Sequence, residues 1–202
     1  MYIIGVAGGS GSGKTTFSEK IISRVSHEDA AVLHQDCYYS VSPPPEIKVH
    51  GASNFDHPLA FDWELLKLHL RQIKEGGSIQ VPVYDYENSQ RTSETQEVGP
   101  CKVLIVEGIF SLWDEHVRNT FDLKVYLSVA ADIRFIRRLH RDAKERGRSL
   151  DGIIRQYYDS VRPMHREFLE PTSQYADLVV GEETDIAAEV LATKVSSIIK
   201  GN

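Results

Sequence analysis

The sequence has too little cysteine for a disulfide-stabilised protein and no apolar run long enough for a membrane-spanning one. Its 202 residues include two cysteines, Cys37 and Cys101, which are too few for a disulfide framework. The histidines are scattered, without the Cys-His or His-x-x-x-His spacing of a transition-metal site. No apolar run reaches the length of a membrane span, and the apolar segment 2–6 is too short for a signal sequence. We therefore expect reduced thiols, a cytoplasmic location and no membrane partner.

The chain also lacks an excess of positive charge. Lys and Arg number 23 against 29 Asp and Glu, which gives a formal net charge of -6. Non-specific nucleic-acid binding usually requires a basic balance, so we expect small-molecule partners and no nucleic acid. A chain of this length with 41% hydrophobic residues can bury one core, and we expect a single domain over residues 1–202.

One motif is unambiguous. Residues 8–15 read Gly-Gly-Ser-Gly-Ser-Gly-Lys-Thr, which matches the phosphate-binding loop G-x-x-x-x-G-K-[ST] and stands between a strand pattern and a helix pattern. The glycines let backbone N–H groups converge on phosphate oxygens, while Lys14 reaches the β- and γ-phosphates and Thr15 ligates Mg²⁺. The predicted nucleoside triphosphate site comprises Gly8, Gly9, Ser10, Gly11, Ser12, Gly13, Lys14, Thr15 and Thr16.

Short apolar runs alternate with stretches of helical period. Strands are expected at residues 2–7, 31–34, 102–106, 123–129 and 176–180, and helices at 16–25, 63–74, 131–146, 150–168 and 184–199. This alternation predicts an α/β fold of the P-loop NTPase type, a parallel five-stranded sheet with helices on both faces. Ligands of such folds bind beyond the carboxyl ends of the strands, so residues 8–15, 35–36 and 107–108 should meet at one edge.

Two segments interrupt the alternation. Residues 40–46 contain three consecutive prolines and should form an exposed loop. Residues 78–100 contain a short alternating run followed by polar residues, and we expect a small β-hairpin that projects over the edge of the sheet.

Two carboxylates end predicted strands. Glu107 follows a buried run, where phosphate-loop proteins often place a second metal-binding group; a salt bridge at the sheet edge is the alternative. Asp36 is placed to accept the proton of an attacking hydroxyl, although local sequence fits a helix cap or a turn equally well.

Arginines are concentrated in one region of this acidic chain. At helical spacing Arg134, Arg138 and Arg141 share a face, and Asp142 precedes Arg146 by four residues, an orientation that favours an ion pair. Guanidinium groups match phosphate oxygens well, so we interpret residues 134–150 as an Arg-rich lid over phosphates. An ordinary solvated helix face is the alternative. The run consists of Arg134, Arg137, Arg138, Arg141, Arg146 and Arg148.

From Ile4 to about Val180, the whole pattern resembles the uridine-cytidine kinase family. Seven separated motifs occur in the family's order; they lie at residues 8–16, 35–39, 54–58, 82–86, 106–109, 137–148 and 161–172. The resemblance implies a kinase of pyrimidine salvage that transfers a phosphoryl group from ATP, with GTP left open, to the 5′-hydroxyl of uridine and cytidine. It also implies Mg²⁺ and a homotetramer.

The resemblance further implies the roles of individual residues. Asp36 is the general base and joins Thr15 and Glu107 in the metal set, while Lys14, Arg141 and Arg146 complete the catalytic set. Asp56 and Arg138 hold the ribose hydroxyls. The remaining nucleoside contacts are Tyr39, Phe55, Tyr84, Tyr86, Ser89, Arg148 and Gln156.

Ser89 is a departure from the family pattern. The family commonly has His three residues after Tyr-Asp-Tyr, where it reads the pyrimidine edge, and here that position is Ser89. A serine is too short for the same contact, so base specificity is open. Two other functions also remain open: phosphorylation of another small acceptor, as in a phosphoribulokinase-like enzyme, and a regulatory ATPase. The chain has no Asn-Lys-x-Asp guanine-reading motif to support the latter.

Overall fold

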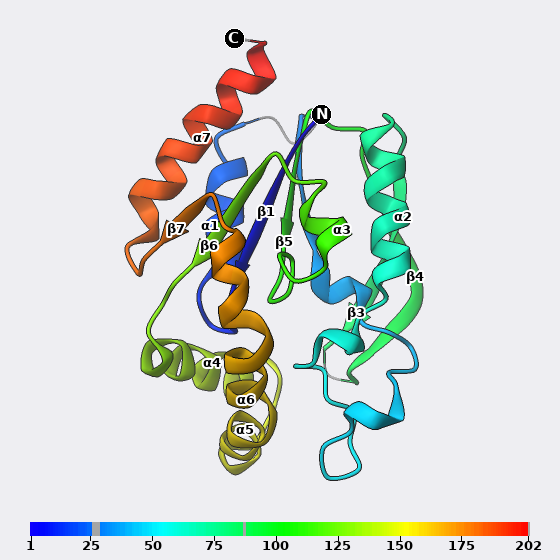
Figure 1. Ribbon diagram of the computed structural model, residues 1–202, viewed down its shortest axis with the longest axis vertical. Helices are drawn as coiled ribbons and strands as arrows, with labels where there is room; N and C mark the ends of the chain where they lie inside the picture. The colour runs from blue at the N-terminus through cyan, green and yellow to red at the C-terminus, as the bar shows by residue number, and fades with distance from the viewer. Residues whose placement is uncertain (26–28, 87, 202) are drawn as a thin grey trace.

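A five-stranded parallel sheet forms the centre of the computed structural model, which describes residues 1–25, 29–86 and 88–201 (Figure 1). Its strand order is β2-β5-β1-β6-β7. The strands are β1 (Tyr2–Gly8), β2 (Ala30–His34), β5 (Val103–Glu107), β6 (Leu123–Leu127) and β7 (Leu178–Val180). The expected fold class is thus confirmed.

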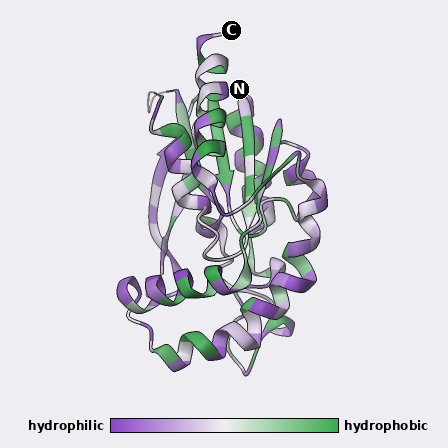
Figure 2. Ribbon diagram, turned by 90° about the vertical axis from the view of Figure 1, so that its left-hand side faces the viewer, coloured by the Kyte–Doolittle hydropathy of each residue, from purple (hydrophilic) through white to green (hydrophobic). Residues whose placement is uncertain are grey.

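Helices cover both faces of the sheet because its strands are apolar on both sides. Ile3 and Leu104 pack with α2 (Trp63–Lys74) and α3 (Glu115–Arg118) in one core. Their neighbours Ile4 and Ile105 point to the other face, into the core with α1 (Lys14–Ile22) and α7 (Thr184–Lys200). Figure 2 shows the hydrophobic colour concentrated on the strands between these layers.

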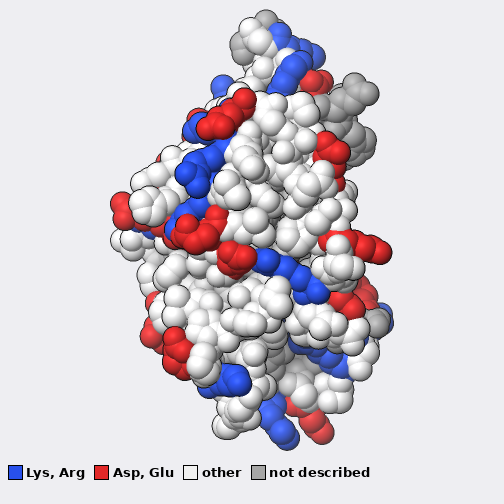
Figure 3. Space-filling view, turned by 90° about the vertical axis from the view of Figure 1, so that its right-hand side faces the viewer, with Lys and Arg blue, Asp and Glu red and all other residues white. Residues whose placement is uncertain are grey.

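The helix α2 begins and ends where the sequence predicts. Its N-cap is Asp62, whose side chain accepts a hydrogen bond of 3.1 Å from the backbone N–H of Leu65. Arg71 and Lys74 lie in the last turn, where positive charge interacts favourably with the helix dipole. Around α2 and the hairpin, acidic and basic side chains are interspersed without one large patch of a single sign (Figure 3).

The predicted hairpin is present as an antiparallel pair, β3 (Ile79–Asp85) and β4 (Gln90–Val98). The pairing joins Ile79 to Val98 and is irregular between Pro82 and Tyr84. Glu87, between the two strands, lies outside the described residues. The proline-rich loop at 40–46 is mostly exposed and ends in a short 3₁₀ turn, Pro45–Ile47.

The prediction of one helix at 150–168 is wrong in detail. The chain forms α5 (Leu150–Gln156), a wide turn (Tyr157–Val161), α6 (Arg162–Met164), a second wide turn (His165–Leu169) and a 3₁₀ segment (Glu170–Tyr175). Pro163 lacks the N–H that a regular helix would donate to residue 159, which favours such an irregular path. The short helix α3 was not expected, and β6 and β7 are shorter than predicted.

A long helix, α4 (Ala131–Glu145), follows β6 and carries most of the arginine run. Both cysteines are free. Within the described ranges, none of the helices combines the length and the apolar character needed to cross a membrane.

Candidate active site

The phosphate-binding loop connects β1 to α1 at the carboxyl edge of the sheet. Gly11 and Gly13 have φ angles of +82° and +89°, which residues with a side chain rarely adopt. The loop borders a cleft of about 900 Å³ that is also lined by the ends of β2 and β5, the hairpin and α4. The edge predicted from the strand pattern is therefore the site of this cleft.

Lys14 and Thr15 begin α1 at the floor of the cleft. Lys14 is 8% exposed, and its ammonium group donates to the carbonyl of Gly9 at 3.3 Å. Burial lowers the pKa of Lys14 and outweighs the negative charges of Glu107 and Asp36, which raise it. The Thr15 hydroxyl donates to Oε1 of Glu107 at 2.9 Å.

Glu107 ends β5 and accepts a second hydrogen bond of 2.7 Å from His34 Nδ1. Burial raises the pKa of Glu107, but His34 and Lys14 outweigh that effect and leave the pKa below its usual value. The same hydrogen bond raises the pKa of His34. The described residues, those of this site included, contain no group of three or more His, Cys, Asp or Glu suited to a metal. A hydroxyl and a carboxylate still fit Mg²⁺, which usually takes few protein ligands and completes its shell with water and phosphate oxygens.

Asp36 lies in a 3₁₀ turn, Gln35–Tyr38, directly after β2. Its carboxylate faces the cleft and accepts a hydrogen bond of 3.3 Å from the Tyr86 hydroxyl. Desolvation raises the pKa of Asp36, and the charge of Glu107 raises it further. Arg146 stacks over the Tyr86 ring at 4.5 Å, so hairpin, carboxylate and arginine meet at one point.

Aromatic rings line the part of the cleft beneath the hairpin. Tyr39 stacks on Phe61 with ring centroids 4.3 Å apart and contacts Phe55 at 5.2 Å and Tyr84 at 5.1 Å. Tyr84 and Tyr86 meet edge to face, with their ring centroids 5.2 Å apart. The arrangement provides an apolar wall next to Asp36.

Asp56 is buried in a polar network. Its Oδ2 accepts hydrogen bonds of 2.7 Å from the Ser160 hydroxyl and 3.2 Å from Gln156 Nε2. The amide oxygen of Gln156 accepts in turn from Arg138 and Arg148, each at 2.9 Å. Asp56 is thus connected to the arginines through one glutamine.

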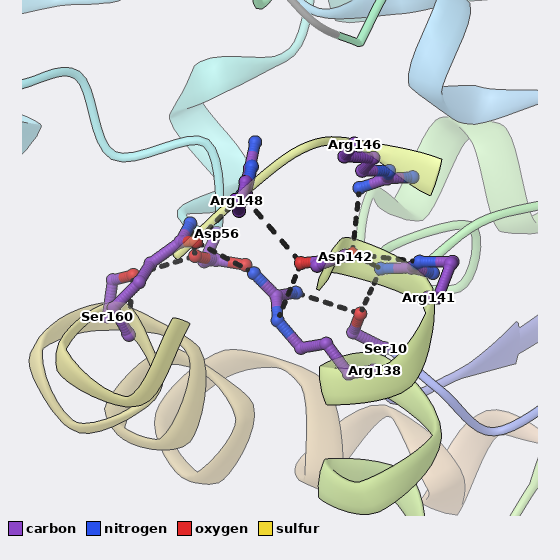
Figure 4. Close-up of polar contacts among 9 residues, drawn as sticks. Ser10, Asp56, Arg138, Arg141, Asp142, Arg146, Arg148 and Ser160 are labelled. Carbon is purple, nitrogen blue, oxygen red and sulfur yellow. Dashed lines mark hydrogen bonds and ion pairs between the residues drawn. The ribbon is translucent and has the colours of Figure 1, made fainter. Parts of the chain in front are cut away.

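The arginines gather around Asp142 (Figure 4). This carboxylate forms ion pairs with Arg138, Arg141, Arg146 and Arg148 at distances of 2.8–3.8 Å. The guanidinium of Arg138 also donates to Ser10 of the phosphate loop at 2.9 Å. Four arginines of the run therefore converge beside the phosphate loop. They do not form the solvated helix face that was the alternative.

Two arginines of the run behave differently. Arg134 is 7% exposed, donates to the Val129 carbonyl at 2.9 Å and lies against the phosphate loop, where a Cβ on Gly9 would be 2.3 Å from its Nη1. Arg137 is exposed at the rim of the cleft.

The predicted site residues fall into two groups. Most of the loop, Asp36, Tyr39, Asp56, Tyr84, Tyr86, Glu107, Arg138, Arg141 and Arg146 line the cleft. Phe55, Ser89 and Gln156 are not among its lining residues but contact those that are. Arg148 lies one step further out and contacts Gln156 and Asp142. Ser89 has a positive φ of 53° and shares a side-chain hydrogen bond with Tyr84.

Sequence reasoning missed His34, Ser160 and the central position of Asp142. His34 had a usable signal, because it ends a strand as Glu107 does and the two are paired in the parallel register. Ser160 lies in the wide turn after α5 and gave no signal. Asp142 was noted only as a partner of Arg146.

Comparison with known proteins agrees with this geometry. Residues 3–187 match the model of the Phosphoribulokinase / Uridine kinase family. A protein of Lactobacillus helveticus named uridine kinase is 46% identical over 200 residues, covering 98% of this chain and 95% of that protein. A uridine kinase of Bacillus pumilus is 44% identical with the same coverage. The solved structure of a possible uridine kinase from Bacillus stearothermophilus has a TM-score of 0.63 and 22% identity, covering 89% of this chain and 88% of that one.

Proposed function

Because the chain belongs to the Phosphoribulokinase / Uridine kinase family, we propose that it is a uridine kinase, which transfers a phosphoryl group from a nucleotide donor to uridine. In finer detail, we propose that ATP phosphorylates the 5′-hydroxyl of uridine and of cytidine. The observation that carries this proposal is a single cleft in which the phosphate loop, Asp36 and the aromatic wall around Tyr39 face one another.

The donor side of the cleft consists of the loop and the arginines. Backbone N–H groups of the loop bind the phosphates, and Lys14 contacts the β- and γ-phosphates. Arg141 and Arg146 stabilise the charge that spreads over the oxygens of the transferred group. In this proposal residues 134–150 act as a lid that excludes water when both substrates are bound.

Thr15 and Glu107, with Asp36 nearby, would hold Mg²⁺. The ion neutralises phosphate charge when bound. His34 orients Glu107 through its 2.7 Å hydrogen bond.

Asp36 is the general base of the proposed reaction. Its carboxylate takes the proton of the 5′-hydroxyl as that oxygen bonds to the γ-phosphorus and the bond to ADP breaks. A raised pKa makes Asp36 a stronger base than an ordinary aspartate, provided that it remains deprotonated at the working pH.

The acceptor side of the cleft binds the nucleoside in this proposal. Asp56 accepts from the ribose hydroxyls while Arg138 donates to them, and Gln156 connects the two. The ring of Tyr84 contacts the base, supported by Tyr39 beneath it. An aromatic wall suits a flat base better than it suits a sugar phosphate, which needs a cationic clamp.

The test is ADP release by the purified protein with Mg-ATP and one acceptor at a time. Uridine and cytidine should stimulate release strongly, while adenosine and ribulose 5-phosphate should not. Stimulation by ribulose 5-phosphate alone would support the other small-acceptor function, and equal release without any acceptor would support a regulatory ATPase.

A further inference from the structure

The helix α4 buries a charged face, whereas an ordinary surface helix buries an apolar one. It buries Arg134, Arg138 and Asp142, at steps of four residues, and leaves Ile136 52% exposed. Helices usually bury their apolar stripe, because that burial supplies most of their stabilisation. The orientation of α4 therefore needs another explanation than folding.

Asp142 is the centre of the buried stripe and is fully inaccessible to solvent. Burying a charge costs several kcal/mol per ion, roughly the amount that a good partner returns, so ion pairs of this kind add little net stability. Nearby guanidinium groups overcome the desolvation of Asp142 and hold the pKa of the carboxyl below its usual value, so it stays charged.

The contacts of Asp142 occupy only part of each guanidinium group. Arg138 faces Asp142 through Nε, 3.5 Å away, while Nη1 and Nη2 donate to Ser10 and Gln156. The Nε and Nη2 atoms of Arg141 lie 2.9 and 2.8 Å from Oδ1 of Asp142. The loop after α4 is also fixed, because the N–H of Arg148 donates to the Asp142 carbonyl at 3.1 Å. One carboxylate thus supports arginines on both the helix and the loop.

We propose that Asp142 is a positioning residue that holds Arg138, Arg141, Arg146 and Arg148 in one preorganised anion-binding cluster beside the phosphate loop (Figure 4). Four guanidinium groups this close repel one another, and without the carboxylate they separate and must be reordered when phosphate binds. Preorganised charge costs no reorganisation at the moment of reaction. The proposal rests on the proposed function and deepens it, since the cluster lies between the donor and the acceptor side of the same cleft.

The decisive variant is Asp142→Asn, with Asp132→Asn as matched control. Asp132 lies on the same helix, is exposed and gives the same change of charge. Groups that orient the ligands of a metal ion are worth about 10- to 100-fold, and we expect Asp142→Asn to lower kcat by a comparable factor. It should also raise the KM for ATP through Arg141 and Arg146. The KM for uridine should rise less, because Arg138 loses its support while Ser160 still holds Asp56. Asp132→Asn should match the wild type.

Circular dichroism and thermal unfolding show whether each variant is folded. A folded Asp142→Asn with wild-type kcat and KM for ATP would overturn the proposal. Should Asp142→Asn fail to fold, Asp142→Glu decides, since it keeps the charge but shifts the carboxylate by one methylene. The proposal then expects a smaller loss of the same kind, and wild-type kinetics would contradict it. If neither variant folds, Asp142 has a structural role and the proposal is wrong.

Direct ATP binding separates this test from the proposed function. If the wild type releases no ADP with uridine, the proposed acceptor is wrong, yet the Kd of Mg-ATP for Asp142→Asn against Asp132→Asn still tests the role of Asp142. A weaker Kd in Asp142→Asn supports that role, and equal Kd values would overturn it.

Discussion

The hydroxyl of Tyr86, on the hairpin, donates a 3.3 Å hydrogen bond to Oδ2 of Asp36, which follows β2. The contact joins the hairpin to the carboxylate of the central edge and places an aromatic ring where an acceptor would lie. It also fixes the direction of the carboxylate, which a general base needs. Variants at Asp36, in the phosphate loop, at Ser89 and at His165 test this account of the site and its surroundings.

Replacing Asp36 with Asn should abolish turnover while leaving ATP binding nearly intact. The amide keeps the shape of the side chain but cannot accept the proton, and general bases contribute about 10²- to 10⁴-fold. Steady-state ADP release and equilibrium binding of Mg-ATP check this, with Asp132→Asn as control. A loss of ATP affinity as large as the loss of kcat would contradict the assignment of Asp36.

Replacing Gly11 with Ala should destabilise the phosphate loop. A Cβ there would lie 2.2 Å from the carbonyl oxygen of Arg134, and the residue has a positive φ. Gly13 is the matched control, because its φ is also positive but no atom lies within 4 Å of its added Cβ. Gly13→Ala should cost about 1–2 kcal/mol for the left-handed conformation alone, and Gly11→Ala should cost more. Equal unfolding midpoints in urea would show that the contact with Arg134 does not matter.

Replacing Ser89 with His tests the departure from the family pattern. His tolerates the positive φ of 53° at this position better than most residues, so the hairpin should stay folded. The longer side chain should lower the KM for uridine and cytidine and leave the KM for ATP unchanged. If both nucleoside KM values stay as they are in the wild type, the base edge is not read from this position.

His165 should make the protein sensitive to acid. Burial lowers its pKa from 6.5 to about 4, and the charges of Arg134, Arg166 and Lys14 act in the same direction. Between these two values the unfolded chain binds more protons than the folded one, so the free energy of unfolding falls as the pH falls.

Urea unfolding at pH 7.5 and pH 5 checks this expectation. His165→Gln should lose less stability than the wild type between the two values, and the exposed His116→Gln should behave as the wild type does. An equal loss in His165→Gln and the wild type would mean that other groups cause the acid sensitivity.

Local signals explain what could be predicted of the fold. The bounds of α2 follow from the Asp62 cap and the apolar period, and the strands of the sheet follow from apolar runs that end at polar residues. The π-helical turns at 157–161 and 165–169 could not be predicted, because tertiary contacts accompany them. Ser160 donates to Asp56, Tyr157 packs on Phe135 of α4, and Phe168 packs on His57.

The site was predictable to the extent that its residues carry a motif or end a strand. The phosphate loop, Asp36 and Glu107 meet these conditions and lie together at the edge of the sheet. Asp142 does not, because its position among four arginines depends on the rotation of α4 about its axis. Charged residues at helical spacing normally face solvent, and only the tertiary structure shows that this stripe is buried.

The most direct test of the central claim is to identify the phosphorylated product by ³¹P NMR and mass spectrometry, with uridine and 5′-deoxyuridine as acceptors. The account predicts uridine 5′-monophosphate with one ADP released per product, and no phosphorylation of 5′-deoxyuridine. Phosphate on the 2′- or 3′-hydroxyl, or ADP release without a phosphorylated nucleoside, would contradict it.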